Sequence, residues 1–219
     1  MKTTSFQPPR GTPPVSPWLI RHGQQVLLAF AAAVAAVLVT TFVVTRLQET
    51  ERRAWEQLSY AQSLAAQGRN QDAAKTVDAL LATRRTGTET VQALLLKSDL
   101  LLRERKKDEA LAAAREALRQ AVSTEYKSLS SLSVARALEE DGRAAEACDA
   151  YGRFVKEFPD HFLVPRAYAQ QARLMASLGR LPEARANWEK LITLYPSSLW
   201  AADAKESLED LKPPSPPAK

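Results

Sequence analysis

The sequence predicts an all-α protein, a right-handed solenoid of four helix pairs and a capping helix, preceded by one transmembrane helix. An alanine returns every 37 residues, at Ala73, Ala110, Ala147 and Ala184. Only 7 of the 219 residues are glycine, and 45% are of apolar type, with many alanines and leucines, which favours helices. An uncharged apolar run of 19 residues precedes the repeats. A fixed period over four copies indicates stacked repeats, an architecture that usually binds other molecules rather than catalyses.

Proline-rich segments occupy both ends of the chain. Five prolines fall within the first 20 residues, and four fall within the last seven. Repeated prolines favour extended, polyproline-like chain over helices. We therefore expect disordered tails at residues 1–24 and 212–219.

The apolar run predicts a transmembrane helix over residues 25–45. Residues 26–44 carry no charge, and Arg21 and Arg46 bound them. At about 1.5 Å per residue such a run can cross the hydrocarbon core of a bilayer. The run is longer than the apolar core of a signal peptide and no cleavage site follows it, so we expect an uncleaved anchor that contacts lipid. A cleaved signal and a buried helix of a soluble protein remain alternatives.

The charges near the span indicate its orientation. The segment before it contains Lys2, Arg10 and Arg21 and no acidic residue. This favours an N-terminus in the cytoplasm and an exported repeat domain, with the reverse orientation left open. Much of the net charge of +5 lies in this N-terminal part, so the repeat domain is close to neutral. Nothing in that balance indicates nucleic-acid binding.

After a juxtamembrane linker at residues 46–53, the repeat domain is expected over residues 54–211. In the last copy we predict helix A at 163–178, a turn at Gly179 and helix B at 182–194, followed by a terminal helix at 199–211. A small residue in each helix A lets the repeating alanine of helix B approach closely. These small residues are Ala61, Ser98, Ala135 and Ala172. Tyr151 and Trp188 are expected to fill the gap to the next pair.

This pattern resembles the tetratricopeptide repeat. The fourth copy matches that family's pattern at Tyr168, Ala172, Gly179, Ala184, Trp188 and Pro196, and the third at Ala135, Gly142, Ala147, Tyr151 and Pro159. The usual period is 34 residues, and the period of 37 here implies longer loops between pairs. In architecture the chain is similar to the ancillary subunit of the bacterial Sec translocon and to other cell-envelope tetratricopeptide proteins.

No catalytic, cofactor or metal site is expected. The chain has two histidines, His22 and His161, and a single cysteine, Cys148. No nucleophile elbow or glycine-rich phosphate loop is present. Cys148 follows a packing alanine, so we interpret it as a small core residue.

The resemblance implies a partner-binding groove on the concave face, which helix A lines in this family. The corresponding positions are Leu58, Leu95, Asp99, Leu102, Arg103, Leu132, Arg136 and Arg173. We expect this groove to hold an extended or helical peptide, with Arg136 and Arg173 meeting an acidic group. The alternative is that Leu58, Leu95 and Leu132 pack between helices.

Together these expectations favour a non-catalytic protein-interaction scaffold. It would be single-pass in the bacterial inner membrane, with a periplasmic repeat domain that holds a peptide segment or an envelope-complex subunit during export or envelope assembly. Two alternatives stay open, a structural subunit that forms homo-oligomers and a regulatory component that faces the cytoplasm.

Overall fold

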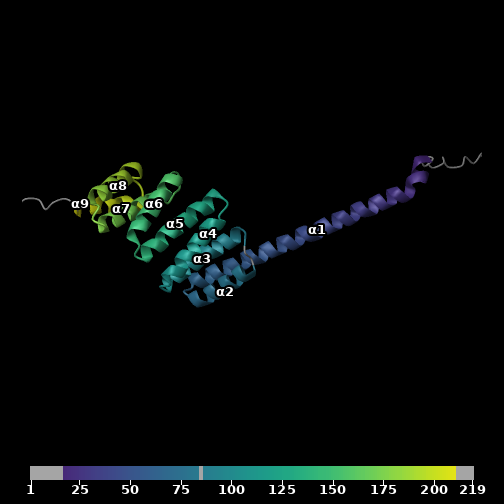
Figure 1. The fold of residues 1–219 in the computed structure, drawn as a ribbon, viewed down its shortest axis with the longest axis horizontal. Coiled ribbons are helices and arrows are strands. Elements are labelled where there is room, and N and C mark those ends of the chain that lie inside the picture. Colours follow the sequence, from purple (N-terminus) through teal and green to yellow (C-terminus); the bar gives the residue numbers. More distant parts are fainter. Residues whose placement is uncertain (1–16, 84–85, 211–219) are drawn as a thin grey trace, which may run out of the picture. The chain divides into compact units, whose positions relative to one another are not determined.

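The computed structural model describes residues 17–83 and 86–210, and all regular secondary structure in these ranges is helical. The helices are α1 (Pro17–Ala66), α2 (Asn70–Thr83), α3 (Thr88–Arg103), α4 (Lys107–Gln120), α5 (Thr124–Glu140), α6 (Ala144–Glu157), α7 (Val164–Ser177), α8 (Leu181–Leu194) and α9 (Leu199–Asp210). Figure 1 shows them in chain order. The tail expected at 212–219 lies outside the described residues, as does most of the one expected at 1–24.

The chain divides into two compact units, residues 1–52 and 53–219. In the described part of the first unit the chain is helical from Pro17. Residues 17–24 therefore belong to α1 and not to the expected disordered tail. A proline suits the first turn of a helix because its missing N–H has no partner there in any case. Residues 46–53, the expected linker, also lie within α1.

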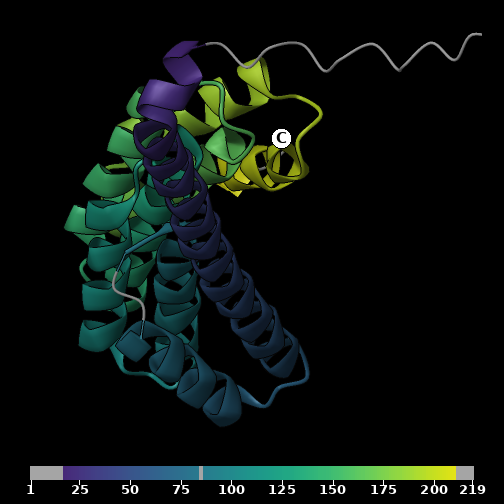
Figure 2. The ribbon, with the colours of Figure 1, turned by 90° about the vertical axis from the view of Figure 1, so that its right-hand side faces the viewer.

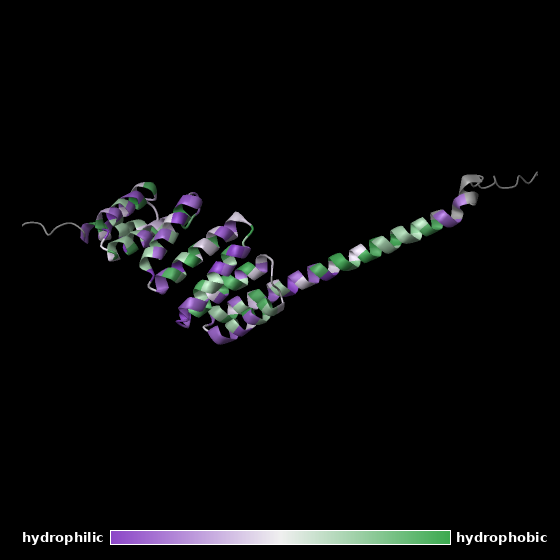
Figure 3. Cartoon of the chain, viewed as in Figure 1, coloured by the Kyte–Doolittle hydropathy of each residue, from purple (hydrophilic) through white to green (hydrophobic). Residues whose placement is uncertain are grey.

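Helix α1 is the one described helix that is long and apolar enough to cross a membrane. Figure 3 shows a nearly continuous hydrophobic stretch along it. Leu27, Phe30 and Leu38 on this stretch are 70%, 70% and 65% exposed. The hydroxyls of Thr40 and Thr41 donate to the carbonyl oxygens of Ala36 and Val37, at 2.8 Å each. Such bonds satisfy hydroxyl groups inside the helix itself.

The second unit is a stack of helix pairs. The end of α1 pairs with α2, and α3–α4, α5–α6 and α7–α8 form the next three pairs, with α9 as the cap. Each helix from α2 to α9 packs against the next, and α3 also contacts α5 while α7 contacts α9. Figures 1 and 2 show this stacking from two directions. The predicted helical solenoid is confirmed.

The small residues of the repeat lie where the two helices of each pair meet. All eight residues of the repeating set have no exposed surface; they are Ala61, Ser98, Ala135 and Ala172 with Ala73, Ala110, Ala147 and Ala184. In the second pair the contact is a hydrogen bond, because the Ser98 hydroxyl donates to the carbonyl oxygen of Ala110 at 3.0 Å. Larger side chains at these positions would force the helix axes apart.

The turn from helix A to helix B has one geometry in all four pairs. Gly68, Gly142 and Gly179 have φ angles of +77°, +81° and +75°, and Arg105 takes the same left-handed conformation with φ +64°. The next residue's N–H then bonds back to the helix, as from Arg143 to the carbonyl oxygen of Leu138 at 3.0 Å. This is the hydrogen bond of a Schellman helix end. Glycine adopts such angles without steric cost, and arginine does not.

Candidate partner-binding groove

Five of the eight predicted groove residues line one hollow of about 280 Å³ on the helix-A face of the array. The hollow lies between α3 and α5, with further lining from α6 and α7. Its walls are Leu95, Ser98, Asp99, Leu102, Leu129, Leu132, Ser133, Arg136, Tyr151 and Arg166. Residues three and four apart on one helix share a face, which explains why α3 contributes Leu95, Asp99 and Leu102 together.

Some leucines of the hollow are buried in the core, and others are partly exposed to the open space. Leu132 is 8% exposed, whereas Leu95 and Leu102 are half-buried and also line the open space. Leu58 differs, because it is 1% exposed and lies within the core of the first pair, beside Val77 and Leu100. The expectation that Leu58 lines the groove is therefore wrong. A side chain covered by its own domain cannot contact a partner.

The acidic partner of Arg136 is supplied by the protein itself. Its guanidinium donates to Asp99 at 2.7 Å, and Arg103 forms an ion pair with the other oxygen of the same carboxylate at 2.8 Å. Asp99 and Arg136 are separated by 37 residues, one period of the repeat, so they occupy equivalent positions on neighbouring A helices. All three side chains are partly exposed, which keeps the energy of these ion pairs small.

Arg173 does not join Arg136 at one site. It pairs with Asp203 of α9 at 3.3 Å and donates to the Gln170 side-chain oxygen at 3.0 Å. Arg173 is also missing from the residues that line the hollow. The two arginines thus face separate carboxylates within the chain, and the expectation that they share an external acidic group is not supported by their positions.

A residue that the sequence reasoning missed, Arg166, supplies a cation to the hollow. It lies in the first turn of α7, is partly buried, and has no acidic side chain in an ion pair with it among the described residues. Leu129, another missed lining residue, precedes Arg166 by one period of 37. Leu129 also lies three residues before Leu132, on the same face of its helix. Applying the 37-residue period to this second position of helix A would have identified both Leu129 and Arg166 from the sequence.

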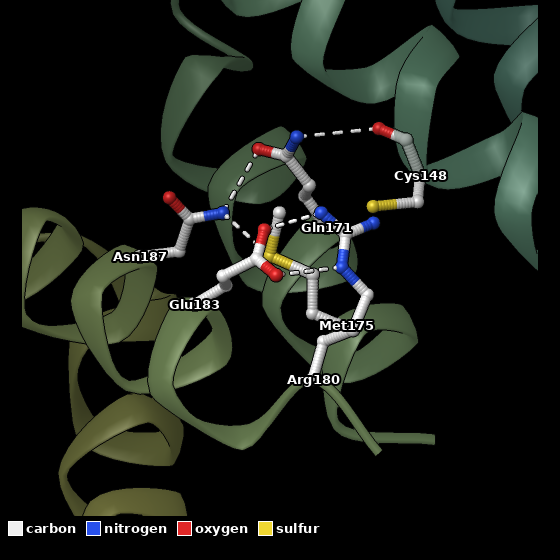
Figure 4. Close-up of polar contacts among 6 residues, drawn as sticks. All are labelled: Cys148, Gln171, Met175, Arg180, Glu183 and Asn187. Carbon is white, nitrogen blue, oxygen red and sulfur yellow. Dashed lines mark hydrogen bonds and ion pairs between the residues drawn. The ribbon is translucent and has the colours of Figure 1, made fainter. Parts of the chain in front are cut away.

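Polar side chains join the third and fourth pairs (Figure 4). The Gln171 amide donates to the carbonyl oxygen of Cys148 at 3.2 Å and accepts from Asn187 at 3.0 Å. Gly152 makes room for this bridge, since a Cβ atom there would lie 2.6 Å from the Gln171 amide nitrogen. These bonds satisfy polar groups where the helices of neighbouring pairs meet.

Cys148 and Tyr151 are buried in this part of the array. Burial raises the pKa of the Cys148 thiol, which keeps it protonated and unreactive. Burial and a hydrogen bond to Glu139 at 2.7 Å raise the pKa of Tyr151. In the described part of the chain, no three His, Cys, Asp or Glu side chains are grouped so that they could hold a metal ion.

Family models of the tetratricopeptide repeat match residues 60–126, and then 131–161 and 166–198. The chain belongs to the tetratricopeptide repeat family. The matched segments cover the helix pairs that carry the 37-residue register, so the resemblance expected from the sequence is confirmed. Members of this family are typically protein-interaction scaffolds. No curated protein matches the sequence significantly.

Solved structures of MamA share the fold of this tetratricopeptide array. The crystal structure of MamA has a TM-score of 0.55 at 15% identity, covering 68% of this chain and 86% of that one. A double mutant, MamA RS-1 ArsTM, has a TM-score of 0.56 at 16% identity, covering 66% of this chain and 76% of that one. A further crystal structure of MamA protein has a TM-score of 0.55 at 15% identity, covering 75% and 79%. At such identities the likeness concerns the fold alone.

Proposed function

We propose that this tetratricopeptide protein is a non-catalytic adaptor, anchored in a bacterial inner membrane by α1, with its repeat domain in the periplasm. The hollow between α3 and α5 holds a segment of a partner protein in export or envelope assembly. The observation that carries the proposal is that Leu95, Asp99, Leu102, Leu132 and Arg136, selected by family position, line one hollow.

The chemistry of the hollow favours a segment with an apolar side chain next to an acidic one. Leu95, Leu102, Leu129 and Leu132 offer an apolar surface. Arg166 is the cation of the hollow without an ion pair among the described residues, whereas Arg136 is paired with Asp99. Arginine can bind a carboxylate through two parallel hydrogen bonds, which fixes orientation as well as charge. Arg166 therefore takes the role first expected for Arg136 and Arg173.

The anchor is supported by the exposed apolar surface of α1. A soluble helix with such a surface would be expected to bury it. The threonine hydroxyls of the run bond to their own helix, as a lipid environment requires. Arg46 lies at the end of the run, 5.2 Å from the ring centre of Phe42. Self-association and a cytoplasmic, regulatory repeat domain are the competing functions.

Site-specific photo-crosslinking on the full chain in intact membranes tests the adaptor function. A photoreactive residue at Leu129 should give a discrete adduct with another protein, and Arg166→Glu should reduce that adduct at least tenfold. A photoreactive residue at Lys190, which is exposed on α8 of the outer layer, is the matched control and should give no such adduct. Equal adducts at both positions would contradict the groove, and an adduct with a second copy would favour self-association.

Reporter fusions test the anchor and its orientation. A reporter fused after Lys219 should be active only when it is exported, and the mature protein should retain its N-terminus. A mature chain that starts after residue 45 would show a cleaved signal instead. Activity of the reporter in the cytoplasm alone would favour the regulatory alternative.

A further inference from the structure

A second hollow lies away from the concave face, at the edge where helix B of one repeat connects to helix A of the next. Its volume is about 490 Å³, larger than that of the concave hollow. The start of α5 and the loop between α6 and α7 line it, with Thr124, Glu125, Ser128, Glu157, Phe158, Pro159, Asp160, His161 and Phe162. We call this space the loop-edge hollow.

Three ring side chains, Phe158, His161 and Phe162, are among the residues that line the loop-edge hollow. Phe162 is 74% exposed and stacks on His161 with ring centres 4.6 Å apart. His161 in turn packs edge-on against the buried Phe154, at 5.4 Å between ring centres. The exposed ring of Phe162 is thus connected to the core through His161. A solvent-facing aromatic surface suits a flat or ring-shaped apolar group.

The charge around these rings is of one sign. Glu125, Glu157 and Asp160 line the hollow and are exposed, and no lysine or arginine lines it. None of the three carboxylates has an ion-pair partner within the described part of the chain, unlike Asp99 and Asp203. Such a surface repels anionic lipid and attracts a basic segment. Proline-rich segments bind aromatic-lined grooves because their extended conformation costs little entropy to fix.

The protein carries a segment with this chemistry in residues 211–219, Leu-Lys-Pro-Pro-Ser-Pro-Pro-Ala-Lys. It has four prolines, two lysines and no acidic side chain. The preceding helix α9 ends at Asp210, about 18 Å from its first residue at 1.5 Å per residue. The last residue of α9, Asp210, is therefore distant from the edge at which α9 begins, and a second copy can supply the proline-rich segment without that constraint.

We propose that the loop-edge hollow binds residues 211–219 of a second copy, with prolines on Phe158 and Phe162 and a lysine among Glu125, Glu157 and Asp160. This surface is separate from the concave hollow, so the proposal does not depend on the adaptor function. A contact between the end of one copy and the flank of the next is heterologous and can continue from copy to copy.

A fluorescent synthetic peptide of residues 211–219, titrated against the full chain in nanodiscs, tests the proposal by anisotropy. The chain used carries Lys212→Glu and Lys219→Glu, so that its own segment does not compete. We expect saturable binding that weakens at higher salt and falls at least tenfold in a Glu157→Lys, Asp160→Lys variant. Phe162→Ala should also weaken binding without changing the melting temperature, because that ring is mostly exposed.

The matched control reverses two exposed carboxylates elsewhere, with Glu189→Lys and Glu206→Lys, and should leave binding unchanged. Equal loss in both charge-reversed proteins, or a peptide with both lysines changed to glutamate that binds as well, would overturn the proposal. So would the absence of saturable binding up to millimolar peptide. A last experiment measures binding to phosphatidylglycerol vesicles. If the protein binds them, loses that binding in Phe162→Ala and does not bind the peptide, this edge is a lipid contact instead.

Discussion

The second helix pair and the two that follow it have the same register but different cores. Four residues after the repeating alanine the second pair has Ala114, whereas the third and fourth have Tyr151 and Trp188. The buried side chains of the third and fourth pairs form one continuous cluster, which also takes in Leu111 and Ala114 of α4 and extends to Ala204. The other buried residues of α3 and α4 are divided among the core of the first pair and two small clusters, one of them made of Leu101, Ala110 and Ala113.

The difference shows that a repeat can keep its backbone geometry while it loses the large side chains that join it to its neighbours. Stability of a solenoid is close to a sum of the stabilities of its repeats and of the interfaces between them. We therefore expect the second pair to be the weak part of the array. The hollow lies against α3 and so borders this part of the array.

The largest effect is expected from removing an aromatic side chain of the continuous core. Trp188 is 4% exposed, and Trp188→Ala should lower the free energy of unfolding by about 3–5 kcal/mol. Tyr60 is 57% exposed on α1, and Tyr60→Ala should cost no more than about 0.5 kcal/mol. Denaturant melts of both variants measure the difference. Equal losses would mean that the core is not concentrated in the last two pairs.

A smaller loss is expected from overfilling the contact between the two helices of a pair. Ala184 has no exposed surface, so Ala184→Leu should destabilise the array by about 1–3 kcal/mol. Ala186 lies two residues further along α8 and is exposed, so Ala186→Leu is the control for changed helix propensity and should be nearly neutral. Unchanged melting temperatures in both variants would contradict the register of the repeat.

Substitutions in the turns between helix A and helix B should change the stability in opposite directions, depending on whether glycine is introduced or removed. Arg105 holds the left-handed conformation that glycine holds in the other three turns. Arg105→Gly should therefore stabilise the second pair by about 0.5–1 kcal/mol. Gly142→Ala should destabilise by about 1 kcal/mol through its φ angle alone, because an added Cβ meets nothing within 4 Å. Calorimetric melts that shift in the same direction would show that the four turns are not equivalent.

The smallest effect is expected from protonation of His161. The N–H of Leu163 donates to Nδ1 of this ring at 3.2 Å, which requires the neutral form. Burial lowers the pKa of His161 in the folded state below 6.5. The His161 ring thus binds a proton less readily in the folded protein than in the unfolded chain. Its neutral form contributes stability above about pH 7, and this contribution is lost as the pH falls below 6.5 toward the pKa of the folded protein. Urea midpoints for His161→Phe should fall less between pH 7.5 and 5.5 than those of the unchanged protein.

Much of the array could be predicted because its determinants are local. The predicted helix at 182–194 corresponds to α8 at Leu181–Leu194, and the predicted helix at 199–211 corresponds to α9 at Leu199–Asp210. Proline and glycine set these boundaries through backbone angles that depend on a few neighbouring residues. The start of α1 was missed because proline occurs both in extended chain and in first turns, and its local sequence does not choose between them.

The candidate groove was predicted only in part, for reasons that lie between repeats. Leu58 and Leu95 occupy the same position in successive copies, yet Leu58 is closed into the core of the first pair and Leu95 borders the hollow. Whether a leucine at this position is buried depends on the side chains that the next pair packs against it, as Leu100 does in the cluster of Leu58. The pairing of Arg136 with Asp99 could have been inferred from their separation of one period, because equivalent residues on neighbouring A helices lie side by side.

The sequence by itself determined the fold class, the period and the contacts of the small residues, because helix formation and close approach depend on local residue types. Only the tertiary structure decided which charges are already satisfied. Asp99 and Asp203 form ion pairs with the two arginines first expected to bind a partner, and Arg166 lines the hollow without such a pair among the described residues. An ion pair needs its two charged groups within about 4 Å of each other, so the charge available to a partner depends on neighbours in space that are distant in the chain.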